Sequence, residues 1–198
     1  DFVLTENING VTSLDVNNKG ISDLTGIAGF TALTTLNCSK NQLVSLELSS
    51  NTALTELSCH TNSITALDVS ANTALTSLDV SSNTALTDLH CQENQLTFLN
   101  VSGNTALATL NCYSNSLTFL DVSSNTALTQ LYCNDNQLIH LNMRNGITDG
   151  LTNFDATGNS LTCIEVNADD IAYATANWTH ANGNIDDGVA FSVVCSPE

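Results

Sequence analysis

Cysteine and histidine side chains are the first candidates for chemistry in this 198-residue sequence. Five of its seven cysteines recur at intervals of 21 residues, with one longer interval of 32: Cys38, Cys59, Cys91, Cys112 and Cys133. A regular thiol array is able to hold a metal ion or to exchange disulfides, but no Cys-x-x-Cys pair supports either chemistry. A column of small buried side chains accounts for the same spacing, since buried thiols are inert. We therefore expect these cysteines to be reduced, buried and free of metal.

Two of the four histidines adjoin cysteines, in the pairs Cys59–His60 and His90–Cys91. An adjacent imidazole could activate a thiol as a nucleophile. The alternating pattern around both pairs is typical of β-strands, in which neighbouring side chains point to opposite faces, so neither pair is able to touch. The sequence also lacks a nucleophile elbow, a His-Glu-x-x-His motif and a phosphate-binding glycine loop. We therefore expect neither an enzyme nor a cofactor.

Five carboxylates form a second regular series, because each directly follows a leucine of the repeated segments: Asp15, Glu47, Asp68, Asp79 and Asp121. Oxygen ligands of this kind suit calcium. The sequence lacks the Gly-Gly-x-Gly-x-Asp arrangement of calcium-binding solenoids. We therefore interpret the series as a solvated acidic face and predict no metal site.

An internal repeat defines the elements that position these residues. The pattern Leu-x-x-Leu-x-Cys-x-x-Asn-x-Leu recurs at residues 33–43, 54–64, 86–96, 107–117 and 128–138. Ten-residue segments of related pattern separate most of these copies, so one coil has 21 residues and two short strands. Leucine and cysteine point inward, and stacked coils place like residues about 4.8 Å apart. This is the leucine-rich-repeat signature in its cysteine form, and it predicts a solenoid of short parallel β-strands with little helix.

Asparagine marks where each Cys-bearing strand, and the last strand of the repeats, bends into the following turn: Asn41, Asn62, Asn94, Asn115, Asn136 and Asn159. Its side-chain amide is able to bond backbone groups that the turn would leave unpaired. A second column is expected to do the same on the other side of the coil: Asn51, Asn72, Asn104 and Asn125.

The repeat is irregular at residues 75–85, an eleven-residue unit that is followed at once by another Leu-x-x-Leu segment. Either this half-coil moves the later Cys-bearing strands to the opposite face of the solenoid, or it is accommodated as a local bulge. The unit itself fits the pattern Leu-x-x-Leu-x-Val-x-x-Asn, which slightly favours the change of face.

We expect a single domain over residues 1–198, with a partial N-terminal cap at 1–10, repeats at 11–161 and a C-terminal cap at 162–198. Phe154 and Ala156 replace leucine and cysteine in the last coil, at residues 151–161. The cap is predicted to contain a short helix at residues 167–178 and a closing strand at residues 191–195. Such a cap is required because the last coil of a solenoid otherwise exposes an apolar face.

Charge and hydropathy exclude several partners. The sequence has 20 acidic and three basic residues, which gives a formal net charge of −17. Nucleic acid and anionic membranes are bound through Lys and Arg, so we expect neither as a partner. No apolar run approaches 18 residues, so we expect no membrane insertion. We expect the chain to be a monomer.

The segment LDVSSNTALTQLYCNDNQL at residues 120–138 resembles secreted leucine-rich-repeat proteins of Bacteroidetes, and its cysteine position resembles the cysteine-ladder internalins. Residues 161–195 are similar to the C-terminal cap common in that bacterial group. The resemblance implies a secreted or cell-surface binding protein. Disulfides persist in such locations, so we expect a bond between Cys163 and Cys195, which flank the cap outside the cysteine column.

The outward positions of the Cys-bearing strands differ from coil to coil, whereas most others repeat as Asp, Ser, Thr and Asn. We therefore predict a surface for an unknown protein or neutral glycan at His90, Gln92, Tyr113, Gln130, Tyr132 and Asn134, with both tyrosines exposed. A secondary patch contains the outward-facing Phe98 and Phe119, with His140 next in the series. The alternative is a structural spacer of a larger surface protein with no ligand of its own.

Overall fold

The structure, a computed structural model, describes residues 8–195, so most of the predicted N-terminal cap at residues 1–10 lies outside the described residues. Each strand is three residues long: β1 (Ser13–Asp15), β2 (Thr35–Asn37), β3 (Glu56–Ser58), β4 (Ala66–Asp68), β5 (Ser77–Asp79), β6 (Asp88–His90), β7 (Thr109–Asn111), β8 (Phe119–Asp121), β9 (Gln130–Tyr132), β10 (His140–Asn142), β11 (Asn153–Asp155), β12 (Cys163–Glu165) and β13 (Ala190–Ser192). The helical segments are η2 (Ile27–Gly29), η3 (Thr148–Gly150), η4 (Ala168–Asp170) and α1 (Ile171–Asn177).

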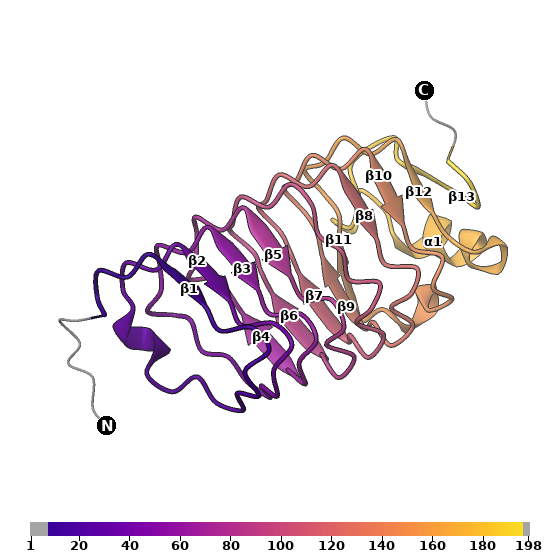
Figure 1. Ribbon diagram of the computed structural model, residues 1–198. Coiled ribbons are helices and arrows are strands. Elements are labelled where there is room, and N and C mark those ends of the chain that lie inside the picture. The colour runs from indigo at the N-terminus through magenta and orange to yellow at the C-terminus, as the bar shows by residue number, and fades with distance from the viewer. Residues whose placement is uncertain (1–7, 196–198) are drawn as a thin grey trace.

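The strands stack in parallel along two sides of an elongated solenoid (Figure 1). One side, which we call the first face, has the sheet β1-β2-β3-β5 followed by the sheet β8-β10-β12-β13. The other side, the second face, has the single sheet β4-β6-β7-β9-β11. Paired strands are 21 residues apart in the regular coils, as in β2–β3 and β7–β9. The predicted leucine-rich-repeat solenoid is confirmed.

Leucines at the centres of the strands form the core. Leu36 pairs with Leu57 on the first face, Leu89 pairs with Leu110 on the second, and all four are at most 2% exposed. The residue two positions later, a Cys or Val in most coils, is also buried, because alternate side chains of a strand point to the same side. Each coil therefore buries its apolar side against the coils before and after it, which is the source of stability in a solenoid.

The predicted asparagine column bonds the turns between strands. The Nδ2 of Asn62 donates to the carbonyl of Cys59 at 2.9 Å, and its Oδ1 accepts the N–H of Leu43 from the preceding coil at 3.0 Å. The residue before this asparagine, Thr61, has a positive φ of 55°. The same left-handed turn recurs at Lys40, Ser82, Glu93, Ser114 and Asp135. The asparagine side chain thus supplies the hydrogen bonds that the turning backbone lacks.

The half-coil at residues 75–85 changes the face of the later strands and produces no bulge. Its strand β5 pairs with β3 on the first face, and the following Cys-bearing strand β6 pairs with β4 on the second face. The 75–85 unit has the same inward leucine and the same left-handed turn before asparagine as its neighbours, so it replaces a Cys-bearing unit directly. Cys38 and Cys59 therefore follow first-face strands, whereas Cys91, Cys112 and Cys133 follow second-face strands.

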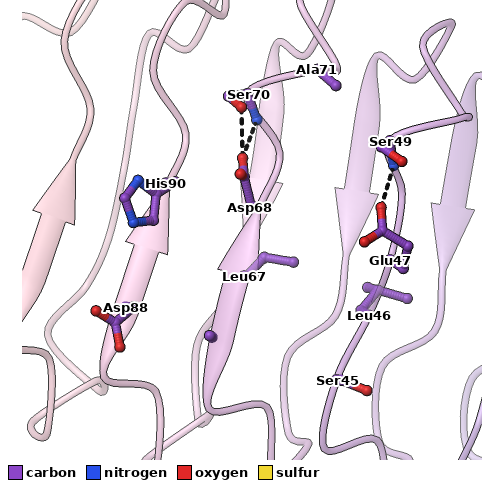
Figure 2. Close-up of a pocket in the computed structure, with 11 residues that line it drawn as sticks. Ser45, Leu46, Glu47, Ser49, Leu67, Asp68, Ser70, Ala71, Asp88 and His90 are labelled. Atoms are coloured by element: carbon purple, nitrogen blue, oxygen red, sulfur yellow. Dashed lines mark hydrogen bonds between the residues drawn. The ribbon is translucent and has the colours of Figure 1, made fainter.

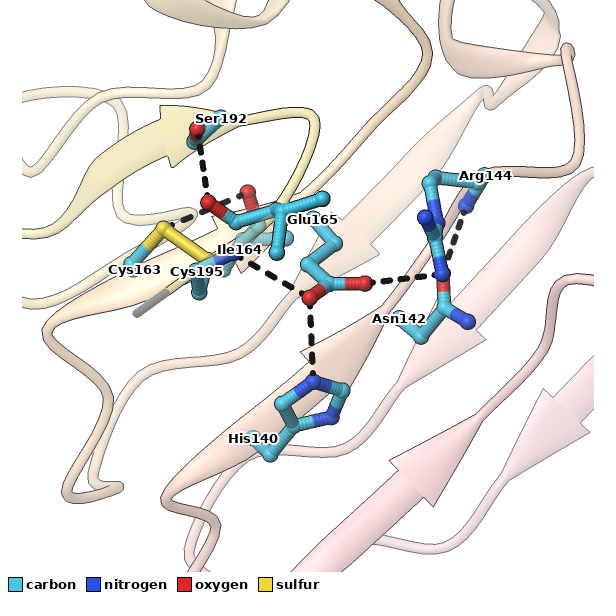
Figure 3. The surroundings of a disulfide bond; sticks show 9 residues. His140, Asn142, Arg144, Cys163, Ile164, Glu165, Ser192 and Cys195 are labelled. Carbon is cyan, nitrogen blue, oxygen red and sulfur yellow. Dashed lines mark hydrogen bonds and ion pairs between the residues drawn. A yellow bond between two sulfur atoms is a disulfide. The ribbon is translucent and has the colours of Figure 1, made fainter. Parts of the chain in front are cut away.

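The C-terminal end closes the solenoid. The predicted last strand is β11, the predicted helix is η4 followed by α1, and the closing strand is β13, which pairs with β12. Trp178 after α1 packs against Phe154 of β11 and Phe191 of β13, with ring centroids 4.3 and 5.9 Å apart. A disulfide joins Cys163 to Cys195, with Cα atoms 5.8 Å apart, as expected (Figure 3). None of the described helices is long and apolar enough to cross a membrane.

Candidate functional site

The five column cysteines are unsuited to thiol chemistry. Each is free and 0% exposed. Burial raises the pKa of Cys38 and Cys112 to about 12. Burial likewise raises the pKa of Cys59, Cys91 and Cys133 well above the ordinary value, so the reactive thiolate is disfavoured. Within residues 8–195, no three His, Cys, Asp or Glu side chains are arranged to hold a metal ion.

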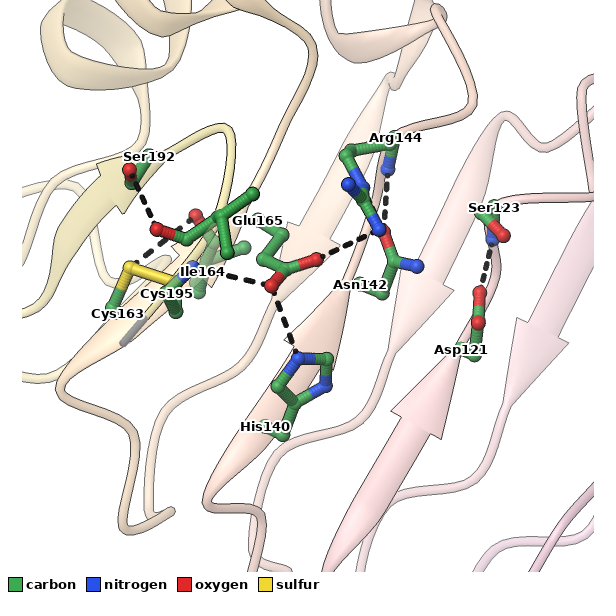
Figure 4. A network of polar contacts seen from close by, with 11 residues as sticks. Asp121, Ser123, His140, Asn142, Arg144, Cys163, Ile164, Glu165, Ser192 and Cys195 are labelled. Atoms are coloured by element: carbon green, nitrogen blue, oxygen red, sulfur yellow. Dashed lines mark hydrogen bonds and ion pairs between the residues drawn. A yellow bond between two sulfur atoms is a disulfide. The ribbon is translucent and has the colours of Figure 1, made fainter. Parts of the chain in front are cut away.

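The strand carboxylates have a structural role that the sequence interpretation missed. Asp68 Oδ1 accepts the N–H and the hydroxyl of Ser70 at 2.9 and 2.7 Å, and Asp121 accepts the N–H of Ser123 at 2.8 Å (Figures 2 and 4). The same bond to the residue two positions later occurs after Asp15, Asn37, Glu47, Asp79, Asn100, Asn142 and Asp155. The series is also divided between the two faces, and its side chains hold the turn backbone rather than forming only a solvated face.

Three consecutive second-face strands depart from this turn bond. The equivalent positions on β6, β7 and β9 are His90, Asn111 and Tyr132, and they lie in register with one another. No acceptor within residues 8–195 bonds the backbone N–H groups two positions later, those of Gln92, Tyr113 and Asn134. Ser58 on β3 departs as well, but its neighbours on both sides, Asn37 and Asp79, keep the bond. Glu165 on β12 also departs, and its carboxylate contacts His140 and Arg144 and accepts the N–H of Cys195 instead.

All six residues of the predicted surface lie together on these three strands and the turns after them: His90, Gln92, Tyr113, Gln130, Tyr132 and Asn134. We call them the second-face patch. The prediction that both tyrosines are exposed is wrong, because each is half-buried between the neighbouring coils. The Tyr113 hydroxyl donates to Glu93 Oε1 at 3.0 Å, and this bond raises the pKa of the phenol. Tyr113 is therefore held in place before any ligand arrives.

A hollow of about 620 Å³ adjoins the patch at its N-terminal end (Figure 2). It lies over β4, β6 and the preceding half-coil, and its polar lining includes Glu47, Asp68, Asp88 and His90. The sequence interpretation placed His90 and these carboxylates in separate series. The half-coil at residues 75–85 was the signal that could have joined them, because the change of face brings β6 beside β4.

In the secondary patch, His140 has a structural role, whereas the two phenylalanines remain exposed. Phe119 stacks on His140, with ring centroids 5.0 Å apart and planes 11° apart. His140 Nε2 lies 3.3 Å from Glu165, a carboxylate that is only 5% exposed and also bonds Arg144 at 3.1 Å and the N–H of Cys195 at 3.1 Å (Figures 3 and 4). His140 is thus part of a structural network that joins β10 to the cap. Phe98 and Phe119 are the exposed aromatic residues at this place.

Comparison with known proteins shows similarity to internalins. No protein-family model matches the chain. Internalin J of Listeria monocytogenes serotype 4b (strain F2365) is 43% identical over 51 residues, which are 26% of this chain and 6% of that protein. The solved functional domain of InlJ from Listeria monocytogenes, described as including a cysteine ladder, is 34% identical over 82% of this chain and 45% of its own length, with a TM-score of 0.39.

Two further solved structures match the chain at lower sequence identity. An internalin C2 of Listeria monocytogenes is 22% identical over 96% of this chain and 84% of its own, with a TM-score of 0.40. The leucine-rich-repeat domain of APL1B is 21% identical over 94% of this chain and 55% of its own, with a TM-score of 0.41. The chain spans 6% of the curated relative and 45% of the InlJ domain. The similarity to internalin J supports the resemblance to cysteine-ladder internalins.

Proposed function

We propose that this chain is a binding module, secreted or displayed on a cell surface, that recognises a partner protein through the second-face patch. The observation that supports this most directly is that three adjacent strands lack the turn bond that most other coils have. The positions whose side chains hold the turn backbone in most other coils carry here the imidazole of His90 and the phenol of Tyr132. Between them lies Asn111, whose Oδ1 is buried. The half-buried side chains of His90 and Tyr132 do not hold the turn backbone and are therefore available for recognition.

The chemistry of the patch favours a neutral or basic protein surface. Tyrosine offers an apolar ring with a hydrogen-bonding tip and loses little entropy on binding. The backbone N–H groups of Gln92, Tyr113 and Asn134 have no acceptor in the described part of the chain. They add donors one strand spacing apart, about 4.8 Å. Anionic ligands are repelled by the nearby carboxylates of Asp88 and Glu93 and by the net charge of −17. A surface outside the cell is supported by the Cys163–Cys195 disulfide, since such bonds persist in oxidising compartments.

The proposal is tested with a double variant, Tyr113→Ala and Tyr132→Ala. The purified chain is used to probe arrays of extracellular proteins and of neutral glycans, and each partner found is measured again with the variant. We expect at least roughly tenfold weaker binding, the effect of losing two central aromatic contacts. The control is His60→Ala, a half-buried outward residue on the first face, which is expected to bind as the parent does.

Three outcomes contradict the proposal in different ways. Unchanged binding by the double variant would place the interface elsewhere. If the chain binds only neutral glycans and the double variant loses this binding, the patch is the binding site but its ligand is a glycan and not a protein. Absence of any reproducible ligand would favour the structural spacer, for which the monotonous Asn-Thr-Ala turns are the supporting observation.

A further inference from the structure

The first face has an exposed apolar strip, distinct from the second-face patch. It consists of Phe98, Phe119 and Ile139, which are 64%, 43% and 69% exposed. Backbone bonds between consecutive coils keep the 21-residue register here, so Phe98, Phe119 and His140 form one row. Ile139 adjoins His140, and its N–H bonds the carbonyl of Thr118 at 3.0 Å in the preceding coil. The strip therefore extends over three coils, about 10 Å.

The N-terminal end of the strip has a place for a cation. One face of the Phe119 ring is covered by His140. In the coil before Phe98, the residue of the same row is Ser77, which is small and exposed. In the coil before that, Glu56 pairs in register with Ser77. An ammonium or guanidinium group above Ser77 would lie between an aromatic ring and a carboxylate, each about one strand spacing away.

The acidic side chains around the strip favour a positively charged ligand. Asp79 and Asp121 point outward from β5 and β8 beside it, and the nearby Arg144 is already paired with Glu165 at 3.1 Å. The chain as a whole has a net charge of −17. A second copy of the chain would bring carboxylates against carboxylates, and an anionic membrane would be repelled in the same way. A basic protein segment with apolar side chains is the complement of this surface.

We propose that the strip on the first face is a second binding site, which docks a basic apolar segment of a partner protein. Its apolar side chains lie on Phe98, Phe119 and Ile139, and a Lys or Arg side chain sits above Ser77, between Phe98 and Glu56. The two faces of the solenoid then engage different partner surfaces, and the first-face site does not depend on the second-face patch.

The test uses three fluorescent eight-residue peptides as probes and the whole chain as receptor. One peptide alternates leucine and lysine, the second alternates leucine and glutamate, and the third contains only lysine. We expect the leucine–lysine peptide to bind most tightly and Phe98→Ala with Phe119→Ala to weaken it about tenfold. The matched control is Val44→Ala, since Val44 is 58% exposed but lies outside the strip. The variant Tyr113→Ala with Tyr132→Ala is expected to leave peptide binding unchanged, so this site and the second-face patch fail or succeed separately.

A charge variant tests the cation site without removing an aromatic ring. Glu56→Gln with Asp79→Asn is expected to weaken the leucine–lysine peptide by roughly fivefold, the effect of losing two nearby opposite charges. Asn at position 79 keeps the turn bond, as Asn37 and Asn100 do. Asp68→Asn with Asp88→Asn removes the same charge from the second face and is expected to have a smaller effect.

Several results would overturn this site. They are failure of the leucine–lysine peptide to bind, equal binding of the leucine–glutamate peptide, and unchanged binding by both the phenylalanine and the charge variants. Sedimentation showing a dimer of the parent chain that is lost in the phenylalanine variant would assign the strip to self-association and would also refute the proposal.

Discussion

Removal of one asparagine from the turn column tests how the solenoid satisfies its buried backbone. Asn115 Oδ1 accepts the N–H of Leu96 at 2.9 Å, and its Nδ2 donates to the carbonyls of Cys91 and Cys112 at 2.9 and 3.1 Å. In Asn115→Ala the Leu96 N–H loses its acceptor, which costs about 1–3 kcal/mol. Each carbonyl keeps a bond from another asparagine, so each loss costs about 0.5–1.5 kcal/mol. The sum of these ranges is a total loss of about 2–6 kcal/mol.

The matched control is Asn125→Ala, in the second asparagine column. Its Nδ2 donates to the carbonyls of Val101 and Asn104 at 3.0 and 2.8 Å, and both carbonyls also accept backbone N–H groups. Its Oδ1 is buried and has no partner within residues 8–195, so its removal relieves an unsatisfied atom. We therefore expect a smaller loss, about 1–2 kcal/mol. The volume removed is the same in both variants, so packing contributes little to the difference.

Urea unfolding followed by circular dichroism measures both variants, with the disulfide kept oxidised. The free energy of unfolding is obtained by linear extrapolation, and the slopes are compared to verify that the same surface unfolds. A loss for Asn125→Ala equal to or greater than that for Asn115→Ala would refute the reasoning. It would mean that the acceptor for the Leu96 N–H adds nothing to the donated bonds, which both variants lose.

Three further predictions follow from the cap, the thiols and the turn carboxylates. Replacing both Cys163 and Cys195 by Ser opens a loop with a sequence separation of 32 residues and should reduce the stability of the cap by about 3–4 kcal/mol. Mass spectrometry that finds both cysteines alkylated without reduction would contradict the bond. Thiol titration of the native chain should detect almost none of the five column cysteines, and all five after unfolding without reductant; stoichiometric zinc would contradict this. Burial raises the pKa of Asp68, but the bonds from Ser70 outweigh it, so the folded pKa lies below the ordinary value of 3.8. The stability from this bond is therefore present above about pH 4 and is lost as the pH falls through the folded pKa. Asp68→Asn keeps the bond and should reduce the acid sensitivity measured by thermal melts from pH 5 to pH 2, and an unchanged pH profile would refute the assignment.

The sequence alone determined the local geometry of the repeat. A period of two residues places leucine and cysteine on the same side of each strand, and a period of 21 residues places like residues in adjacent coils. These two periods were sufficient to predict the buried cysteine column, the asparagine turns and the cluster of His90, Tyr113 and Tyr132 on one surface. The position of Cys163 and Cys195 outside the column, with the resemblance to secreted proteins, was sufficient to predict their pairing.

The tertiary structure alone decided which coils become neighbours and how the side chains between them are used. The two half-coil types have equivalent local geometry, so only the pairing of β6 with β4 showed that the later cysteines change face. Half-burial of both tyrosines and the bond from His140 to Glu165 likewise depend on groups contributed by other coils. The turn bonds of the carboxylates are local. In the sequence, however, an aspartate that accepts a turn N–H cannot be distinguished from an aspartate that only faces solvent. Local periodicity therefore specifies the direction of each side chain, whereas its contacts are set by strands distant in sequence.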